Sequence, residues 1–263
     1  SEMCIRDSLH GRNHHSVGFG MVTEFATAAP GNNALVPNTK ASLPLTLKYN
    51  GYATSMFGKC HEVAPYLASP MGPFDAWPAG GVGFEYFYGF IAGEANQYDP
   101  ALYEGNNPVD PPKTPEEGYH LTEDLADKAI GWIHQQKALM PDKPFFTYFS
   151  TGACHAPHHV PKEWADRYKG KFDAGWDAVR DEIFERQKAQ GMIPAHSELP
   201  ARHEEIPAWE DMPDEMKPIL ARQMEVYAGF LEHTDYHIGR VIEAIEEMGA
   251  LDNTLIYYIL GDN

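Results

Sequence analysis

Three short apolar runs form the clearest hydrophobic pattern in this chain. They span residues 52–57 (YATSMF), 145–150 (FFTYFS) and 254–260 (TLIYYIL). Runs of this length predict buried strands rather than helices. Pro144 and Gly152 bound the middle run, which favours a central strand for it. Polar residues follow each run, so polar groups are expected at the carboxyl ends of all three strands.

Helices are predicted between these strands. Ser42 is an expected N-cap for a short helix that ends at Tyr49. A second helix is expected from about Thr122, whose hydroxyl can cap a first turn rich in acidic residues. A long third helix is expected from about Asp214, because apolar residues recur there at three and four positions, and Gly249 is its expected stop.

The remaining segments show no sustained helix-like or strand-like spacing of apolar residues. Residues 62–120 are rich in Gly, Pro and aromatic residues and are interpreted as long ordered loops. The aromatic run at 84–90 is interpreted as core or loop packing, with the lining of a pocket as an alternative. Residues 162–213 are charged and carry several Pro and Trp, which indicates a surface excursion rather than a flexible linker.

The order strand, helix, strand predicts parallel crossovers, and therefore an α/β fold with a mostly parallel sheet flanked by helices. Ligands of such sheets gather at the carboxyl ends of the strands. The residues expected along that edge are Lys59 and His61, His155 and His158, and Asp262 and Asn263.

Charge and composition restrict the class of partner. The chain has 20 Lys and Arg against 38 Asp and Glu, and its net charge of -18 argues against nucleic acid and against an anionic membrane surface. No apolar run is long enough for a membrane span, and three cysteines cannot build a disulfide framework. Localisation and oligomeric state stay unknown. An acidic protein that acts on an anionic ester must concentrate positive charge in the site itself.

The residues expected at the strand ends suit the cleavage of an anionic ester. Lys59 would place a positive charge beside a developing anion, and His61 and His155 can hold or move protons near neutral pH. Asp262 and Asn263 offer hard oxygen ligands for calcium or magnesium, although two ligands alone are too few.

Each motif also has a simpler interpretation when taken alone. GKCH could be an ordinary loop with a surface lysine, HAPHH a proline-stiffened loop, and GDN a turn. Their coincidence at three strand ends favours a site. Cys154 is interpreted as a small packed residue rather than a nucleophile.

The same segments resemble those of sulfatases. GYATSMFGKCH resembles the family segment GYxTxxxGKWH, FFTYFSTGACHAPHHVP resembles its second histidine segment, and LIYYILGDN resembles the strand that leads to its metal-binding GDN. GRNHHSVG resembles the stretch after the nucleophile motif. The resemblance runs from about Leu9 to Asn263 and covers about the first half of a large bacterial arylsulfatase. It implies an alkaline-phosphatase-like fold and hydrolysis of a small-molecule sulfate ester, an aryl sulfate, to phenol and sulfate.

The resemblance also implies residue roles. Lys59 would contact the sulfate, His61 would support the nucleophile, and His155 would contact the sulfate or protonate the leaving oxygen. Asp262 and Asn263 would coordinate Ca2+, with Mg2+ possible. The nucleophile of the family is formylglycine, made from a Cys or Ser in a C/S-x-P-x-R motif, and covalent catalysis acts there together with the metal.

The chain departs from the family pattern at several positions. Cys4 in CIRDS lacks the Pro and Arg of the nucleophile motif and is rejected as the nucleophile. Cys60 stands where the family usually has Trp. Residues 1–8 are interpreted as a non-native leader and residues 9–263 as a partial sulfatase catalytic domain, incomplete at both ends.

The expectation from these departures is a chain that is inactive as it stands. Two alternatives remain from the sequence: a phosphodiesterase or phosphonate monoester hydrolase of the same superfamily, and a non-catalytic truncated copy that binds an ion weakly.

Overall fold

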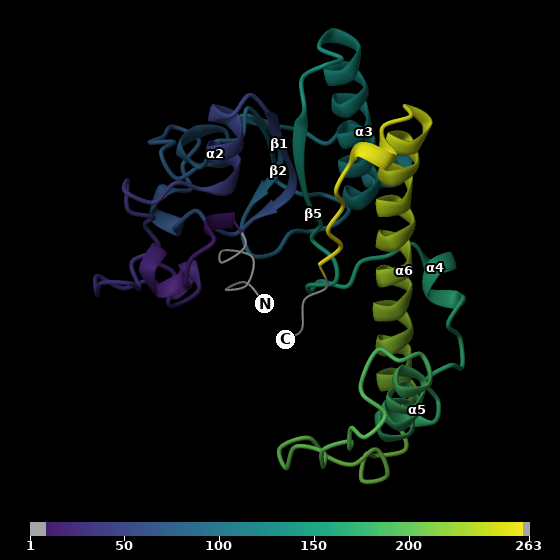
Figure 1. Cartoon of the computed structure of the whole chain (residues 1–263). Coiled ribbons are helices and arrows are strands. Elements are labelled where there is room, and N and C mark those ends of the chain that lie inside the picture. Colours follow the sequence, from purple (N-terminus) through teal and green to yellow (C-terminus); the bar gives the residue numbers. More distant parts are fainter. Residues whose placement is uncertain (1–8, 260–263) are drawn as a thin grey trace. The chain divides into compact units, whose positions relative to one another are not determined.

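The computed structural model describes residues 9–259, which form two compact units. The second unit is His158–His233, and the first contains the described residues on either side of it. Figure 1 shows their elements along the chain. Within residues 9–259, no helix combines the length and the apolar character that crossing a bilayer requires.

The first unit is built on one mixed sheet of five strands, in the order β4-β3-β2-β1-β5. The strands are β1 (Ala53–Cys60), β2 (Tyr86–Ile91), β3 (Leu102–Glu104), β4 (Asn107–Val109) and β5 (Phe145–Ser150). β1, β2 and β5, labelled in Figure 1, are mutually parallel. β3 and β4 pair antiparallel at one edge of the sheet. The predicted fold class, a mostly parallel sheet flanked by helices, is confirmed.

Two of the three predicted strands are present. β5 has the predicted bounds, and β1 starts one residue later than predicted and continues through Lys59 to Cys60. Ser55 lies opposite Thr147, and their hydroxyl oxygens are 3.0 Å apart. β5 is nevertheless an edge strand of the described sheet rather than a central one, and all its residues are half-buried.

The interpretation of residues 62–120 as loops is wrong for the aromatic run, because most of that run forms β2. Phe87, Tyr88 and Phe90 are at most 2% exposed, so both faces of this strand are covered. A strand that is buried on both faces needs no alternation of polar and apolar residues, so its sequence shows no two-residue period. The interpretation of the run as core packing is confirmed.

The third predicted strand is wrong for the residues that the structure describes. Residues 254–259 pair with no strand, and the side chains of residues 255–259 are exposed, Leu255 by 77% and Tyr257 by 76%. Local side-chain bonds hold the segment instead: the Thr254 hydroxyl donates to the Ala250 carbonyl, and the Tyr258 hydroxyl to Asp235. A short apolar run indicates extended chain, but it does not specify a partner strand.

The helices are α2 (Leu43–Tyr49), α3 (Leu121–Leu139), α4 (Lys162–Asp166), α5 (Gly175–Ala189) and α6 (Lys217–Glu247). The cap predicted for α2 is confirmed, since Ser42 Oγ accepts from the Leu45 backbone N–H at 3.2 Å. The cap predicted for α3 is wrong: His120 is the N-cap, and its Nδ1 accepts from the Thr122 N–H. The long helix α6 begins three residues after the predicted start, and Gly249 follows it with a φ of +66°.

Two cores lie on opposite faces of the sheet. Phe57 and Tyr88 pack with α3 and with Val241 and Ile245 of α6. Met56, Cys60, Trp77, Phe84 and Phe87 pack together in the second core. β1 contributes side chains to both cores. The strand that carries Lys59 is therefore packed on both of its faces.

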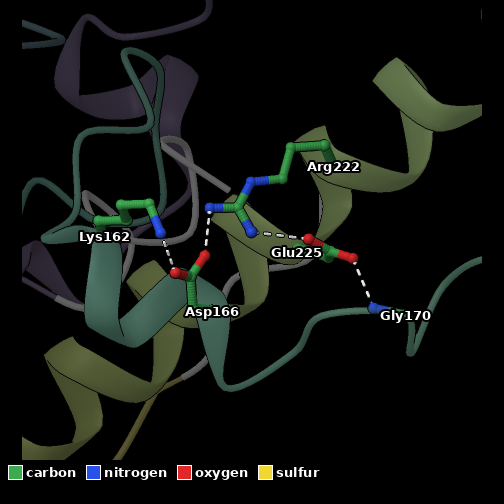
Figure 2. A network of polar contacts seen from close by, with 5 residues as sticks. All are labelled: Lys162, Asp166, Gly170, Arg222 and Glu225. Carbon is green, nitrogen blue, oxygen red and sulfur yellow. Dashed lines mark hydrogen bonds and ion pairs between the residues drawn. The ribbon is translucent and has the colours of Figure 1, made fainter.

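The second unit contains α4, α5 and the residues of α6 up to His233. Figure 2 shows a polar network that joins two of these helices. Arg222 on α6 donates to Asp166 of α4 at 2.8 Å and to Glu225 at 2.7 Å, while Lys162 also pairs with Asp166. Glu225 accepts in turn from the Gly170 backbone N–H. The network links α4, the turn after it and α6 within this unit.

His237, on the part of α6 that belongs to the first unit, is held neutral. It is 6% exposed, and Arg240 donates to its Nδ1 at 2.9 Å. The pKa of His237 is lowered from 6.5 to about 4, mainly by burial and then by the positive charges of Arg240 and His120, against a smaller opposing effect of Asp127.

The free energy of unfolding is expected to fall as the pH is lowered from neutrality to about 4. An unfolded His237 takes up its proton near pH 6.5, but the folded one only near pH 4, so the unfolded state binds more protons in between. We expect a loss of about 1–3 kcal/mol from this group. Urea unfolding of the chain and of His237→Asn over this pH range tests it.

The difference in unfolding free energy between the two proteins should shrink over that range as the pH falls. His196→Asn, at an exposed position of the second unit, is the matched control. A difference that stays constant for His237→Asn would show that His237 is not held neutral.

Candidate functional site

A pocket opens at the carboxyl end of β1, with an empty volume of about 420 Å³ that includes solvent at its mouth. It is lined by Leu9, Met56, Lys59, Cys60, His61, Glu62, Pro78, Val82, Phe84, Tyr148 and Ser150. The apolar members belong largely to the second core. Lys59, near the end of β1, and His61, just after it, are two of the predicted site residues and therefore line one pocket.

His61 is held from two sides. Its Nε2 lies 2.6 Å from Oε1 of Glu24, and its side chain is only 12% exposed. Burial raises the pKa of Glu24, but hydrogen bonds from its own backbone N–H and from His61 outweigh this effect, so the pKa lies below its usual value. Gly93 also packs against the imidazole, where a Cβ would lie 2.7 Å from ring Cε1.

His155 lies in the loop after β5. Its Nδ1 donates to the Ala156 carbonyl at 2.8 Å and lies 3.6 Å from Oε2 of Glu94, and its side chain is 46% exposed. Gly93 and Glu94 are neighbours in the segment after β2, so this one segment contacts both candidate histidines. The carboxyl ends of β1, β2 and β5 therefore converge, although His155 does not line the pocket.

The polar wall of the pocket includes the buried side chain of Glu62, which is 7% exposed. Its Oε2 lies 3.9 Å from Nε2 of His10, which is 5% exposed and does not line the pocket. Burial raises the pKa of Tyr148, and the negative charge of Glu62 raises it further, which keeps the phenol protonated. This wall presents a hydroxyl donor and a buried carboxylate close to Lys59.

The two described cysteines are not placed as nucleophiles. Cys60 is 3% exposed in the second core. Burial raises the pKa of the Cys154 thiol to about 11, so at neutral pH it stays protonated and unreactive. This agrees with the interpretation of Cys154 as a packed residue.

His158, another residue expected at the strand ends, does not line this pocket. His158 belongs to the second unit, where its ring packs edge-on against Tyr227 at 5.3 Å. Asp262 and Asn263 lie outside the described residues, so the metal site remains a prediction. Between residues 9 and 259, no group of three or more His, Cys, Asp or Glu side chains could hold a metal ion.

Sequence reasoning missed Glu24, Gly93 and Glu94. Glu24 lies 37 positions from His61 in a segment without a periodic pattern, so no local signal identifies it. Glu94 has a signal in the sequence, since it is a polar residue that follows an apolar, aromatic run, as the predicted site residues do.

Comparison with known proteins gives a consistent result. Residues 5–263 match the family model named Sulfatase. A sulfatase of Schizosaccharomyces pombe is 32% identical over 97% of this chain and 48% of its own length, and an arylsulfatase of Klebsiella aerogenes is 28% identical over 80% and 44%. The crystal structure of Ps i-CgsB in complex with k-i-k-neocarrahexaose has the same fold, with a TM-score of 0.58 at 19% identity over 96% of this chain and 46% of that one. The chain spans about half the length of the curated relatives it matches.

Proposed function

Because this chain belongs to the sulfatase family, we propose that it forms the sulfate-binding part of an active site that hydrolyses sulfate esters. Its fold is the alkaline-phosphatase-like α/β fold of the solved sulfatases. The observation that carries the proposal is the convergence of the ends of β1, β2 and β5, with Lys59 and His61 in one pocket and His155 joined to the same strand ends through Glu94.

The proposed roles follow from the chemistry of these side chains. Lys59 supplies a fixed positive charge for the sulfate oxygens, on which negative charge grows as the ester bond breaks. His61 supports the nucleophile by accepting or donating a proton. His155, which is half-exposed and close to Glu94, contacts the sulfate or protonates the leaving oxygen.

The proposal extends to the substrate class and the cofactor. The similarity to an arylsulfatase of Klebsiella aerogenes supports an aryl sulfate as the substrate. Calcium, held by Asp262 and Asn263, would supply Lewis-acid chemistry there, and the described residues add no metal cluster of their own. Since C/S-x-P-x-R does not occur in the sequence, we propose that the chain taken alone binds sulfate but does not turn over sulfate esters.

Sulfate titrated calorimetrically into the chain should bind saturably, and Lys59→Ala should weaken this binding by at least about tenfold. A charge-assisted hydrogen bond contributes about 1.5–3 kcal/mol, which corresponds to that loss. Lys113→Ala, at an exposed loop position, is the matched control and should bind like the parent chain.

The same samples should show no hydrolysis of 4-nitrophenyl sulfate, with or without calcium. Equal sulfate affinity in the Lys59→Ala variant would overturn the proposed site, whereas robust calcium-dependent hydrolysis would overturn only the proposed lack of turnover. Binding of phosphate but not of sulfate would favour a phosphoester hydrolase instead.

A further inference from the structure

We infer that Glu24 is a positioning residue for His61: it holds the imidazole with Nε2 protonated, so that Nδ1 is the nitrogen that accepts a proton. This inference rests on the proposed function for its catalytic meaning. The geometry that supports it concerns only the two side chains and their surroundings, and it can be tested without a substrate.

The contact between the two groups specifies where the proton is. Glu24 Oε1 and His61 Nε2 are 2.6 Å apart, a separation typical of a charge-assisted hydrogen bond. An ionised carboxylate only accepts, so Nε2 must carry the hydrogen. The low pKa of Glu24 agrees with an ionised carboxylate at neutral pH. In the neutral imidazole the other nitrogen, Nδ1, is then the acceptor.

The carboxylate is itself held in place. The hydroxyl of Thr23 donates to Oε2 of Glu24 at 3.1 Å, which leaves Oε1 for His61. Thr23 is only 2% exposed and belongs with Glu24 to the single turn η2 (Thr23–Phe25). The segment around this turn is anchored by a small core made of Val17, Phe19, Ala34 and Ala64. Glu24 therefore belongs to a packed segment rather than to a free loop tip, although its own side chain is 46% exposed.

The ring of His61 is also confined by Gly93. A Cβ built there would lie 2.7 Å from Cε1, 2.9 Å from Nε2 and 3.2 Å from Nδ1 of the imidazole. The glycine lets the backbone after β2 lie directly against the ring, which explains why this position carries no side chain. Two segments far apart in the sequence thus fix one ring orientation.

A carboxylate beside an imidazole has a known effect on proton transfer. It fixes the tautomer and stabilises the imidazolium that forms when the other nitrogen takes a proton. Glu24 would therefore act through His61 and would contact neither the sulfate nor the nucleophile, which is why its role is positioning.

The test uses the full chain with 15N-labelled histidine and long-range 1H–15N NMR spectra near neutral pH. His61→Gln identifies the signals of His61 among the 13 histidines. The informative variants are Glu24→Ala, which removes both the charge and the acceptor, and Glu24→Gln, which keeps a carbonyl acceptor without the charge. Glu205→Gln is the matched control, because Glu205 lies 4.0 Å from His203 at an exposed position.

In the parent chain we expect one tautomer for His61, with a pyrrole-type Nε2, a pyridine-type Nδ1 and an Nε2 proton that exchanges slowly enough to be seen. Glu24→Ala should lose that proton signal and give a mixture of tautomers. Glu24→Gln should keep the tautomer with the proton signal moved upfield, and Glu205→Gln should leave His61 unchanged.

A doubly protonated ring, an Nδ1-protonated tautomer in the parent chain, or an unchanged Nε2 proton in Glu24→Ala would each overturn the inference. Should Glu24→Ala fail to fold, the shift in Glu24→Gln decides the matter alone. The NMR spectra are recorded without sulfate, so the tautomer of His61 and the binding of sulfate are measured independently. Either result can contradict its own proposal and leave the other intact.

Discussion

Replacing Gly58 with alanine is expected to destabilise the first unit by more than about 3 kcal/mol, enough to prevent its folding in a chain of ordinary stability. Gly58 lies in β1 with a φ of +110°, a backbone conformation that residues other than glycine rarely adopt. An added Cβ would lie 1.8 Å from the backbone oxygen of Ser150 and 2.7 Å from its carbonyl carbon. Both atoms belong to β5, so relief requires separating β1 from the strand that leads to His155.

Gly131→Ala is the matched control for this substitution. Gly131 lies within α3, is exposed, and has no atom within 4 Å of a Cβ built on it. Alanine there should stabilise the chain by about 0.5–1 kcal/mol, because it reduces the backbone conformational entropy that the unfolded chain loses on folding. Thermal and urea unfolding followed by circular dichroism compare the two. A Gly58→Ala protein that unfolds within about 1 kcal/mol of the parent would contradict the packing described for β1 and β5.

Asp124→Ala should cost about 2–4 kcal/mol of unfolding free energy. Asp124, in the first turn of α3, accepts hydrogen bonds at one oxygen from the Tyr88 hydroxyl at 2.6 Å and the Tyr119 hydroxyl at 2.9 Å. Both tyrosines are at most 3% exposed, so their hydroxyls would lose their acceptor inside the core. Burial raises the pKa of Asp124 and exceeds the opposing effect of these two hydrogen bonds.

Two further variants separate the causes. Asp124→Asn keeps an acceptor oxygen and should lose only about half as much stability, whereas Glu123→Ala, at the adjacent half-exposed position of α3, should change it by less than about 0.5 kcal/mol. Urea unfolding of the three proteins measures these differences. Equal losses in all three would mean that the lost negative charge at the amino end of α3, and not the tyrosine network, sets the effect.

Local patterns predicted those parts of the fold that depend on local interactions. The cap of α2 at Ser42, the strand at residues 145–150 and the long helix before Gly249 each follow from residues within a few positions of one another. β2 was missed because its neighbours on both sides and both faces are distant in sequence, so its residues show no period. Residues 254–259 show the converse error, since an apolar run does not supply its own partner strand.

The candidate site divides in the same way. Lys59, His61 and His155 could be predicted because each follows or ends an apolar run, and the structure places Lys59 and His61 in one pocket. Glu24 and Gly93 could not be predicted, because their relation to His61 exists only after separate segments pack together. The surroundings of a candidate site residue are set by tertiary structure, whereas the candidate residue itself can be predicted from its motif.

The most direct test of the sulfate site is a sulfate titration of the 15N-histidine-labelled chain, followed through all histidine signals. We predict that His61 and His155 shift together and saturate at the same sulfate concentration, because both lie at the converging strand ends. The exposed His196 and His203 of the second unit should not respond. Equal, unsaturated shifts of all histidines, or a response of His155 without His61, would contradict a sulfate site at the ends of β1, β2 and β5.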